Sequence, residues 1–114
     1  MPHCIIECSE NIGEKSDLNE LIKRAYQGIL NSNLFEKQDI KTRLLVFENY
    51  QIGDKRTDFI HITIKILSGR TIEQKKKLSK SILTEFENIN IKPLSITIEV
   101  MEIETQSYEK KIYS

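Results

Sequence analysis

The second residue, Pro2, is the position where a residue type by itself indicates a reaction. Initiator methionine is generally removed before a small second residue, so we expect loss of Met1 to leave Pro2 with a free secondary amine. An ordinary terminal amine has a pKa of about 7.7–8.0, and partial burial or nearby cations lower it. A base that titrates near neutral pH can abstract a proton next to a carbonyl group. Because many Met-Pro openings have no chemical role, Pro2 alone leaves catalysis and an ordinary N-terminus both open.

Two cations occur at alternate positions of one apolar-polar stretch, Lys41 and Arg43. On a strand they would share a face with Leu45 and Phe47. Arginine offers a carboxylate a planar fork, whereas lysine offers a point charge, so both are candidates for binding an anionic substrate. Solvent exposure or a salt bridge between subunits is the alternative interpretation.

Three other kinds of side chain are candidates for a site. Arg70 follows Gly69 at the entrance of an expected helix, where local hydrogen bonding and anion binding, including binding in a neighbouring subunit's site, both remain open. Phe47 is a candidate wall for a substrate pocket, with core packing as its alternative. His3 and His61 are interpreted as structural histidines rather than catalytic acids.

Composition and motifs exclude several classes of function. Seventeen basic residues balance seventeen acidic ones, which gives no overall field for nucleic acid or an anionic membrane. The chain lacks a membrane-length apolar run and a secretory signal, so we expect a cytoplasmic protein. Cys4 and Cys8 are expected to be buried, reduced thiols. With no Gly-rich phosphate loop and no metal-ligand spacing, we expect neither cofactor nor metal.

Four stretches alternate between apolar and polar residues with period two, which is typical of half-buried strands. They cover about residues 2–8, 40–50, 58–67 and 94–101. The third stretch is the clearest, because every second residue from Ile60 to Ile66 is isoleucine.

Two amphipathic helices are expected between these strands. Apolar residues from Leu18 to Ile29 recur at three- and four-residue steps, and Ser16 or Asp17 can cap that helix. The second helix opens with Thr71-Ile-Glu-Gln74, which fits a capping box. Its inner face is expected to comprise Ile72, Leu78, Ile82, Leu83, Phe86 and Ile89.

The order strand, helix, strand therefore occurs twice, in halves of about 1–53 and 54–114 of a single domain. Strand-helix-strand crossovers within one sheet are parallel and right-handed. We expect an α/β (α+β) fold in which tandem β-α-β units form a four-stranded mixed sheet with both helices on one face. The other face would mix charged and apolar side chains, which predicts a homo-oligomer built around that face.

Several segments together resemble a known family. Residues 1–12 (MPHCIIECSENI), 40–43 (IKTR) and 58–74 (DFIHITIKILSGRTIEQ) are similar to 5-carboxymethyl-2-hydroxymuconate isomerases of the tautomerase superfamily. Gly69-Arg70-Thr71 also resembles the strand-to-helix junction of the shorter 4-oxalocrotonate tautomerases. The resemblance covers nearly the whole chain and is strongest over residues 2–12 and 58–83.

The resemblance implies a tautomerase-like doubled fold, assembled as a homotrimer with sites near subunit boundaries. It implies a cofactor-free isomerase in which Pro2 shuttles a proton in an unsaturated 2-oxo polycarboxylic acid, in the breakdown of homoprotocatechuate. Arg43, Lys41 and Arg70 would hold the small-molecule carboxylated substrate. Lys41 departs from the family, which carries arginine there. A promiscuous enol tautomerase and a non-catalytic oligomer that binds a carboxylated ligand are the alternatives.

Overall fold

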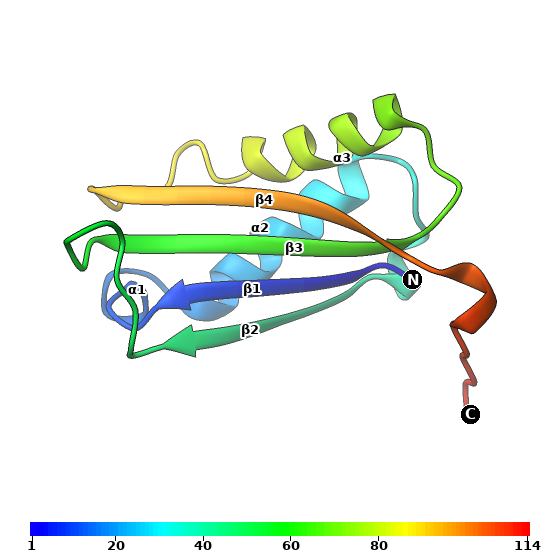
Figure 1. Cartoon of the computed structure of the whole chain (residues 1–114), viewed down its shortest axis with the longest axis horizontal. Helices are drawn as coiled ribbons and strands as arrows, with labels where there is room; N and C mark the ends of the chain where they lie inside the picture. Colours follow the sequence, from blue (N-terminus) through cyan, green and yellow to red (C-terminus); the bar gives the residue numbers. More distant parts are fainter.

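Alternation of apolar and polar residues produces one four-stranded sheet in the computed structural model, which describes residues 1–114 (Figure 1). Its strands are β1 (His3–Ser9), β2 (Lys41–Phe47), β3 (Asp58–Leu67) and β4 (Leu94–Ile103), in the order β2-β1-β3-β4. β1 pairs with β2 and β3 with β4 in parallel, while β1 and β3 pair antiparallel. The expected mixed sheet of two β-α-β units is therefore confirmed.

Two long helices, α2 (Leu18–Asn31) and α3 (Ile72–Thr84), cover the same face of the sheet (Figure 1). The sequence pattern did not predict α1 (Ile12–Lys15) or the single 3₁₀ turns η1 (Lys37–Asp39) and η2 (Thr105–Ser107). Such short elements have no amphipathic period that a sequence could display. None of the helices has the length and apolar character needed to cross a membrane.

The helix starts follow the capping chemistry of their residues. Asp17 caps α2, because its side chain accepts a hydrogen bond from the Asn19 backbone N–H at 3.0 Å. Thr71 and Gln74 form the expected capping box at α3, each side chain accepting from the other residue's backbone N–H. These caps fix where each helix begins after its strand.

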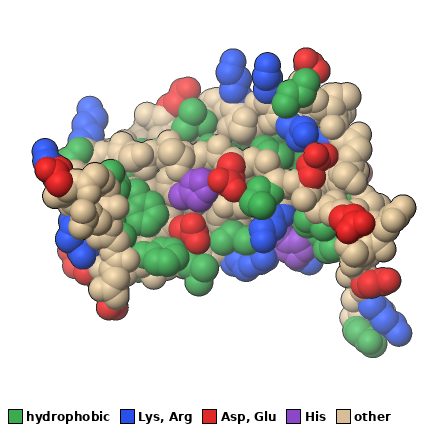
Figure 2. Space-filling model, in the orientation of Figure 1, with side chains coloured by type: hydrophobic (Ala, Val, Ile, Leu, Met, Phe, Trp, Pro, Cys, Tyr) green, Lys and Arg blue, Asp and Glu red, His purple; other side chains and the backbone are tan.

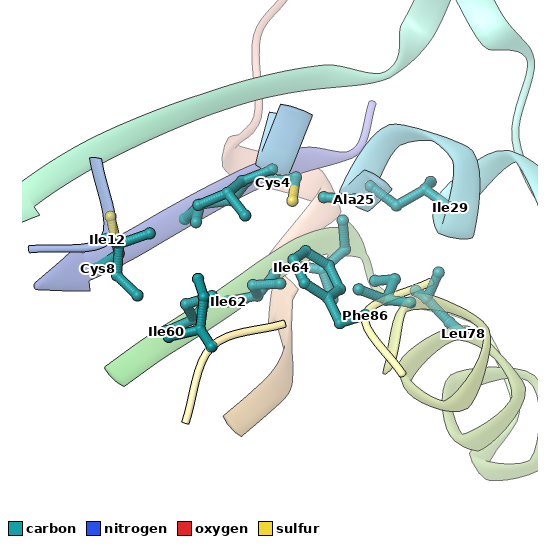
Figure 3. Close-up of a cluster of buried hydrophobic side chains, with 14 of the residues drawn as sticks. Cys4, Cys8, Ile12, Ala25, Ile29, Ile60, Ile62, Ile64, Leu78 and Phe86 are labelled. Carbon is teal, nitrogen blue, oxygen red and sulfur yellow. The ribbon is translucent and has the colours of Figure 1, made fainter. Parts of the chain in front are cut away.

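The core lies between the sheet and the helices, and Figure 3 shows how side chains from both layers meet there. Both cysteines are free and fully buried in it, as expected. Burial raises the pKa of Cys4 to about 12 and that of Cys8 to about 11, so both are neutral thiols at neutral pH. The core comprises Cys4, Ile6, Cys8, Ile12, Leu21, Ala25, Ile29, Ile60, Ile62, Ile64, Ile66, Leu78, Ile82, Phe86 and Ile91.

Two expected core residues of α3 are in fact exposed. Ile72 is 56% exposed and Leu83 is 44% exposed. The reason is that α3 packs along β4, the edge strand of the sheet. Ile72 and Leu83 therefore line shallow grooves between α3 and β4 and do not reach the interior. The second strand is also shorter than expected: it ends at Phe47, because residues 48–57 turn around Gly53 in a left-handed conformation (φ 59°).

Candidate active site

Pro2 lies immediately before the central strand β1, at the end of the sheet where the N-terminus is marked in Figure 1. Its ring is fully buried, and its carbonyl accepts a hydrogen bond from the Lys41 backbone N–H at 3.1 Å. This bond extends the β1–β2 ladder by one residue. The sheet therefore fixes the position of the Pro2 backbone on its β2 side.

A cleft of about 380 Å³ adjoins this end of the sheet. Met1 lines it, together with Arg70 and Gly69 from the junction between β3 and α3, and Phe35 from the segment before η1. Met1 is bonded to the Pro2 nitrogen, so its removal would enlarge the cleft at the point where that nitrogen lies. The topology of a single chain thus brings Arg70 and Met1, the residue bonded to the Pro2 nitrogen, to one cavity.

The electrostatic field at this end of the sheet favours a neutral amine. Burial lowers the pKa of the Met1 ammonium below its ordinary value; Asp39 opposes that shift, and Lys41 and Lys110 add to it. Burial removes the ammonium from water, and the lysines repel it. An amine here loses its proton at a lower pH than an ordinary terminus does.

Arg70 makes the local contacts that were one of the two roles the sequence left open. Its Nη2 donates to the Leu34 carbonyl at 2.8 Å, and its guanidinium carbon lies 5.2 Å from the centre of the Phe35 ring. These contacts orient the guanidinium beside the cleft. Since arginine has five N–H donors, others remain for an anion. Within one chain the Arg70 side chain lines the same cleft as Met1.

A second group of cations lies on the helix-free face of the sheet at the Pro2 end. The ladder places His3 opposite Lys41 on β2 and opposite Lys65 on β3, with Arg43 two residues further along β2. Neither lysine nor Arg43 has a carboxylate partner within 4.0 Å. Burial, then Arg43 and Lys41, lowers the pKa of His3. This cluster is a surface without its own counter-ion, which suits an anionic ligand.

Phe47 lies at the other end of β2, opposite Ser9 in the register, whereas Lys41 lies opposite His3. Its ring is 6.4 Å from that of Phe59, which in turn lies 5.2 Å from Tyr50. Within one chain Phe47 therefore does not reach the cleft of Pro2. It belongs to a partly exposed aromatic cluster at the far end of β2 and the start of β3.

His61 lies near the middle of the helix-free face. Its Nδ1 is 2.6 Å from the Thr97 hydroxyl and its Nε2 is 3.3 Å from a Glu99 carboxylate oxygen. Both ring nitrogens are thus engaged by neighbours on β4. No group of three His, Cys, Asp or Glu side chains in the structure is arranged to hold a metal ion.

Sequence reasoning did not select two residues of the Pro2 end, Lys65 and Tyr108. Lys65 could have been found, because it shares its strand face with His61 and Thr63 in the alternating stretch. Tyr108 follows η2 and reaches His3, which is 105 positions away, with a hydrogen bond of 3.0 Å. No period in the sequence indicates such a contact.

Solved structures show that this arrangement is a tautomerase fold. One is a 5-carboxymethyl-2-hydroxymuconate isomerase from Deinococcus radiodurans R1, at 24% identity and a TM-score of 0.78 over 96% of this chain and 88% of that one. Another is a fused 4-OT wild-type symmetric trimer, at 15% identity and a TM-score of 0.76 over 96% and 93%.

The family follows from the sequence match. The model of the 5-carboxymethyl-2-hydroxymuconate isomerase family matches residues 2–112, and the chain belongs to this family. The 5-carboxymethyl-2-hydroxymuconate Delta-isomerase of Escherichia coli is 33% identical over 79 residues, which are 68% of this chain. The match spans 63% of that relative's length.

Proposed function

We propose that this protein is a cofactor-free isomerase that moves a proton within an unsaturated 2-oxo polycarboxylic acid of the 2-hydroxymuconate type. One observation carries the proposal: the sheet fixes the backbone of Pro2 directly next to Met1, which lines a cleft together with Arg70. Membership of a family described as isomerases supports it. The breakdown of homoprotocatechuate, which the resemblance implied, would be its setting.

In the proposed reaction the Pro2 nitrogen is first the base and then the acid. Removal of Met1 converts that nitrogen from an amide into a secondary amine. The field that lowers the pKa of the Met1 ammonium would act on this amine as well, since it lies one residue deeper. The neutral amine takes a proton from the hydroxyl of the dienol or from the carbon next to the 2-oxo group. The electron pair left behind shifts the conjugated double bonds, and the resulting ammonium returns the proton to another carbon of the same system.

Cations on both sides of Pro2 would hold the carboxylates. Arg70 lies in the cleft beyond the end of β3, while Lys41 and Arg43 lie on β2. A substrate with carboxylates at separate ends would place its central carbons near the nitrogen between them. Negative charge that develops on the 2-oxo oxygen during proton transfer is stabilised by the same cations.

We propose a homotrimer as the active assembly. The helix-free face supports this, since Figure 2 shows apolar side chains interspersed with charged ones across it. Leu45, Phe47 and Met101 are exposed there by 53%, 37% and 46%. The fused 4-OT relative is itself a trimer. Assembly would place Phe47 of one chain against another chain.

The test is ultraviolet monitoring of 5-carboxymethyl-2-hydroxymuconate with protein whose intact mass shows loss of Met1. Processed protein is expected to turn over the substrate. A matched sample that retains Met1, prepared without the methionine aminopeptidase that removes this residue, is expected to be inactive. An amide nitrogen cannot take the proton. Equal rates for the two samples would refute the mechanism and favour a binding role for the fold.

A second candidate is an enol tautomerase with simpler substrates such as phenylpyruvate. Lys41 favours it, because a point charge at this position holds a carboxylate less rigidly than the arginine fork of the family. Parallel assays separate the two functions. A higher kcat/KM for phenylpyruvate than for the muconate would support this second candidate.

A further inference from the structure

Two hydrogen bonds join the C-terminal segment to the cation cluster beside Pro2. His3 Nε2 lies 3.0 Å from the Tyr108 hydroxyl, and His3 Nδ1 lies 3.1 Å from Arg43 Nη1. The rings of His3 and Tyr108 meet edge to face, with centroids 6.1 Å apart. The imidazole therefore bridges the C-terminal segment and β2.

The hydrogen-bond donors in the series Arg43–His3–Tyr108 determine which nitrogen of His3 carries the proton. A guanidinium only donates, so the Nδ1 of His3 must accept from Arg43. The imidazole proton is then on Nε2 and is donated to the oxygen of Tyr108. His3 is neutral in this arrangement, and its surroundings agree: the groups facing it are Lys41, Arg43, Lys65, the terminal amine and the Tyr108 hydroxyl, with no carboxylate.

Tyr108 is held on both sides along the chain. Before it, the Thr105 hydroxyl lies 2.9 Å from that of Ser68, at the end of β3. After it, Lys110 pairs with Asp39 at 3.4 Å, beside the start of β2. The segment is therefore fastened across the end of the sheet, and the Tyr108 hydroxyl has a defined position.

We propose that Tyr108 is a positioning residue, which acts through His3 to hold the Arg43 guanidinium in the orientation that receives a substrate carboxylate. This inference rests on the proposed function. Arg43 uses one of its five N–H donors on His3 and has no ion pair, so it keeps donors free for a ligand. A guanidinium that is already oriented loses less side-chain entropy on binding an anion.

The first measurement is independent of turnover. In ¹⁵N-histidine NMR spectra of the processed protein at pH 7, we expect His3 with an unprotonated Nδ1 and a slowly exchanging proton on Nε2. Tyr108→Phe keeps the ring and removes the acceptor, so the protection of that proton is expected to disappear. Tyr113→Phe, in the same segment and 83% exposed, is the matched control and should match wild type. A proton on Nδ1 of His3, or an Nε2 proton that exchanges as slowly in Tyr108→Phe as in wild type, would overturn this arrangement of hydrogen bonds, the relay from Tyr108 through His3 to Arg43.

The second measurement is anion affinity. Tyr108→Phe is expected to raise KM for 5-carboxymethyl-2-hydroxymuconate about three- to tenfold, the size of one hydrogen bond, with kcat within about twofold. The Kd for adipate, an inert dicarboxylate, should rise by a similar factor. Unchanged adipate affinity would overturn the positioning role even if the NMR signature is present. If wild type shows the relay and binds adipate but has no turnover, the proposed function fails while this inference stands.

Discussion

The nitrogen of Pro2 is an amide while Met1 is attached and a secondary amine once Met1 is gone. Its ring is buried and its carbonyl accepts a hydrogen bond from β2, so the sheet holds the ring that carries this nitrogen in place. Rigid placement of a base is what distinguishes a catalytic amine from any other chain terminus. The predictions at the scale of single residues follow from this.

Pro2→Ala is expected to lower kcat about 100-fold, at the low end of what a positioned acid–base group contributes. The variant keeps an amine after processing but loses the ring that orients it. Stopped assays with intact-mass control measure the effect, and circular dichroism should show an unchanged fold. A loss smaller than about twofold would mean that catalysis does not depend on the ring of Pro2.

The pH dependence of kcat/KM is the second prediction. The amine must be neutral to accept the proton, so activity is expected to rise with pH as this group deprotonates. Because burial and the lysines lower the pKa of a terminal amine at this place, the rise should be centred below the ordinary value of about 8. Lys41→Ala removes one of the repelling charges and should move the rise to higher pH. A wild-type rise centred at or above 8 would contradict the proposed tuning.

Arg43→Ala is expected to lower kcat/KM for a carboxylated substrate. The loss should correspond to about 2–4 kcal/mol of transition-state binding free energy, the range for a charge-assisted contact in an active site. Arg56→Ala is the matched control, since Arg56 packs on Tyr50 in the connection between β2 and β3, at the opposite end of the sheet from Pro2. Steady-state kinetics of both variants decide the matter. If both variants lowered kcat/KM equally, the effect would come from the removal of a positive charge anywhere on the protein and not from the loss of a contact between Arg43 and the substrate.

At the scale of elements, α2 and α3 approach each other closely at Gly28. A Cβ on Gly28 would lie 2.6 Å from the Ile82 Cα and 2.9 Å from the Ser81 carbonyl oxygen, both backbone atoms. The Ser81 hydroxyl also donates to the Gly28 carbonyl at 2.6 Å. The helices can cover the sheet together only because this position has no side chain.

Gly28→Ala is therefore expected to lower the free energy of unfolding by about 1–3 kcal/mol, the usual cost of overpacking. Urea titration followed by circular dichroism measures it. Gly13→Ala is the control, because a Cβ there would be 3.6 Å or more from Leu18, at ordinary contact distance. A Gly28 variant as stable as the control would show that the helices can separate without cost.

Most of the strands and helices could be predicted from the sequence, because they depend on local patterns of residues. Alternation gave the strands, and the capping box at Thr71 gave the start of α3. The exposure of Ile72 and Leu83 was missed, since a helical period shows which face is apolar but not whether a further strand lies beneath it. The contact of Tyr108 with His3 could not be predicted either, because it depends on where the C-terminal segment crosses the end of the sheet and not on any spacing of residues.

At the scale of the whole molecule, the sheet has two features that a monomer leaves unused. Both edge strands, β2 and β4, lack a partner on their outer side. The helix-free face also exposes apolar side chains between its charges. Unlike edges on one chain allow head-to-tail contacts, and such contacts close into a ring when the rotation between chains permits it.

Processed protein is accordingly expected to have a mass in solution of three chains of 13.3 kDa each. Leu45→Glu should shift that mass to a single chain, because it places a carboxylate on an apolar part of the proposed interface, where Leu45 is 53% exposed in the isolated chain. Leu83→Glu introduces the same change at a 44% exposed leucine on α3, on the opposite side of the sheet, and should remain trimeric. Light scattering at micromolar concentration reports the masses, and circular dichroism checks that both variants fold. If wild type is a monomer, or if Leu83→Glu dissociates while Leu45→Glu does not, the helix-free face is not the interface.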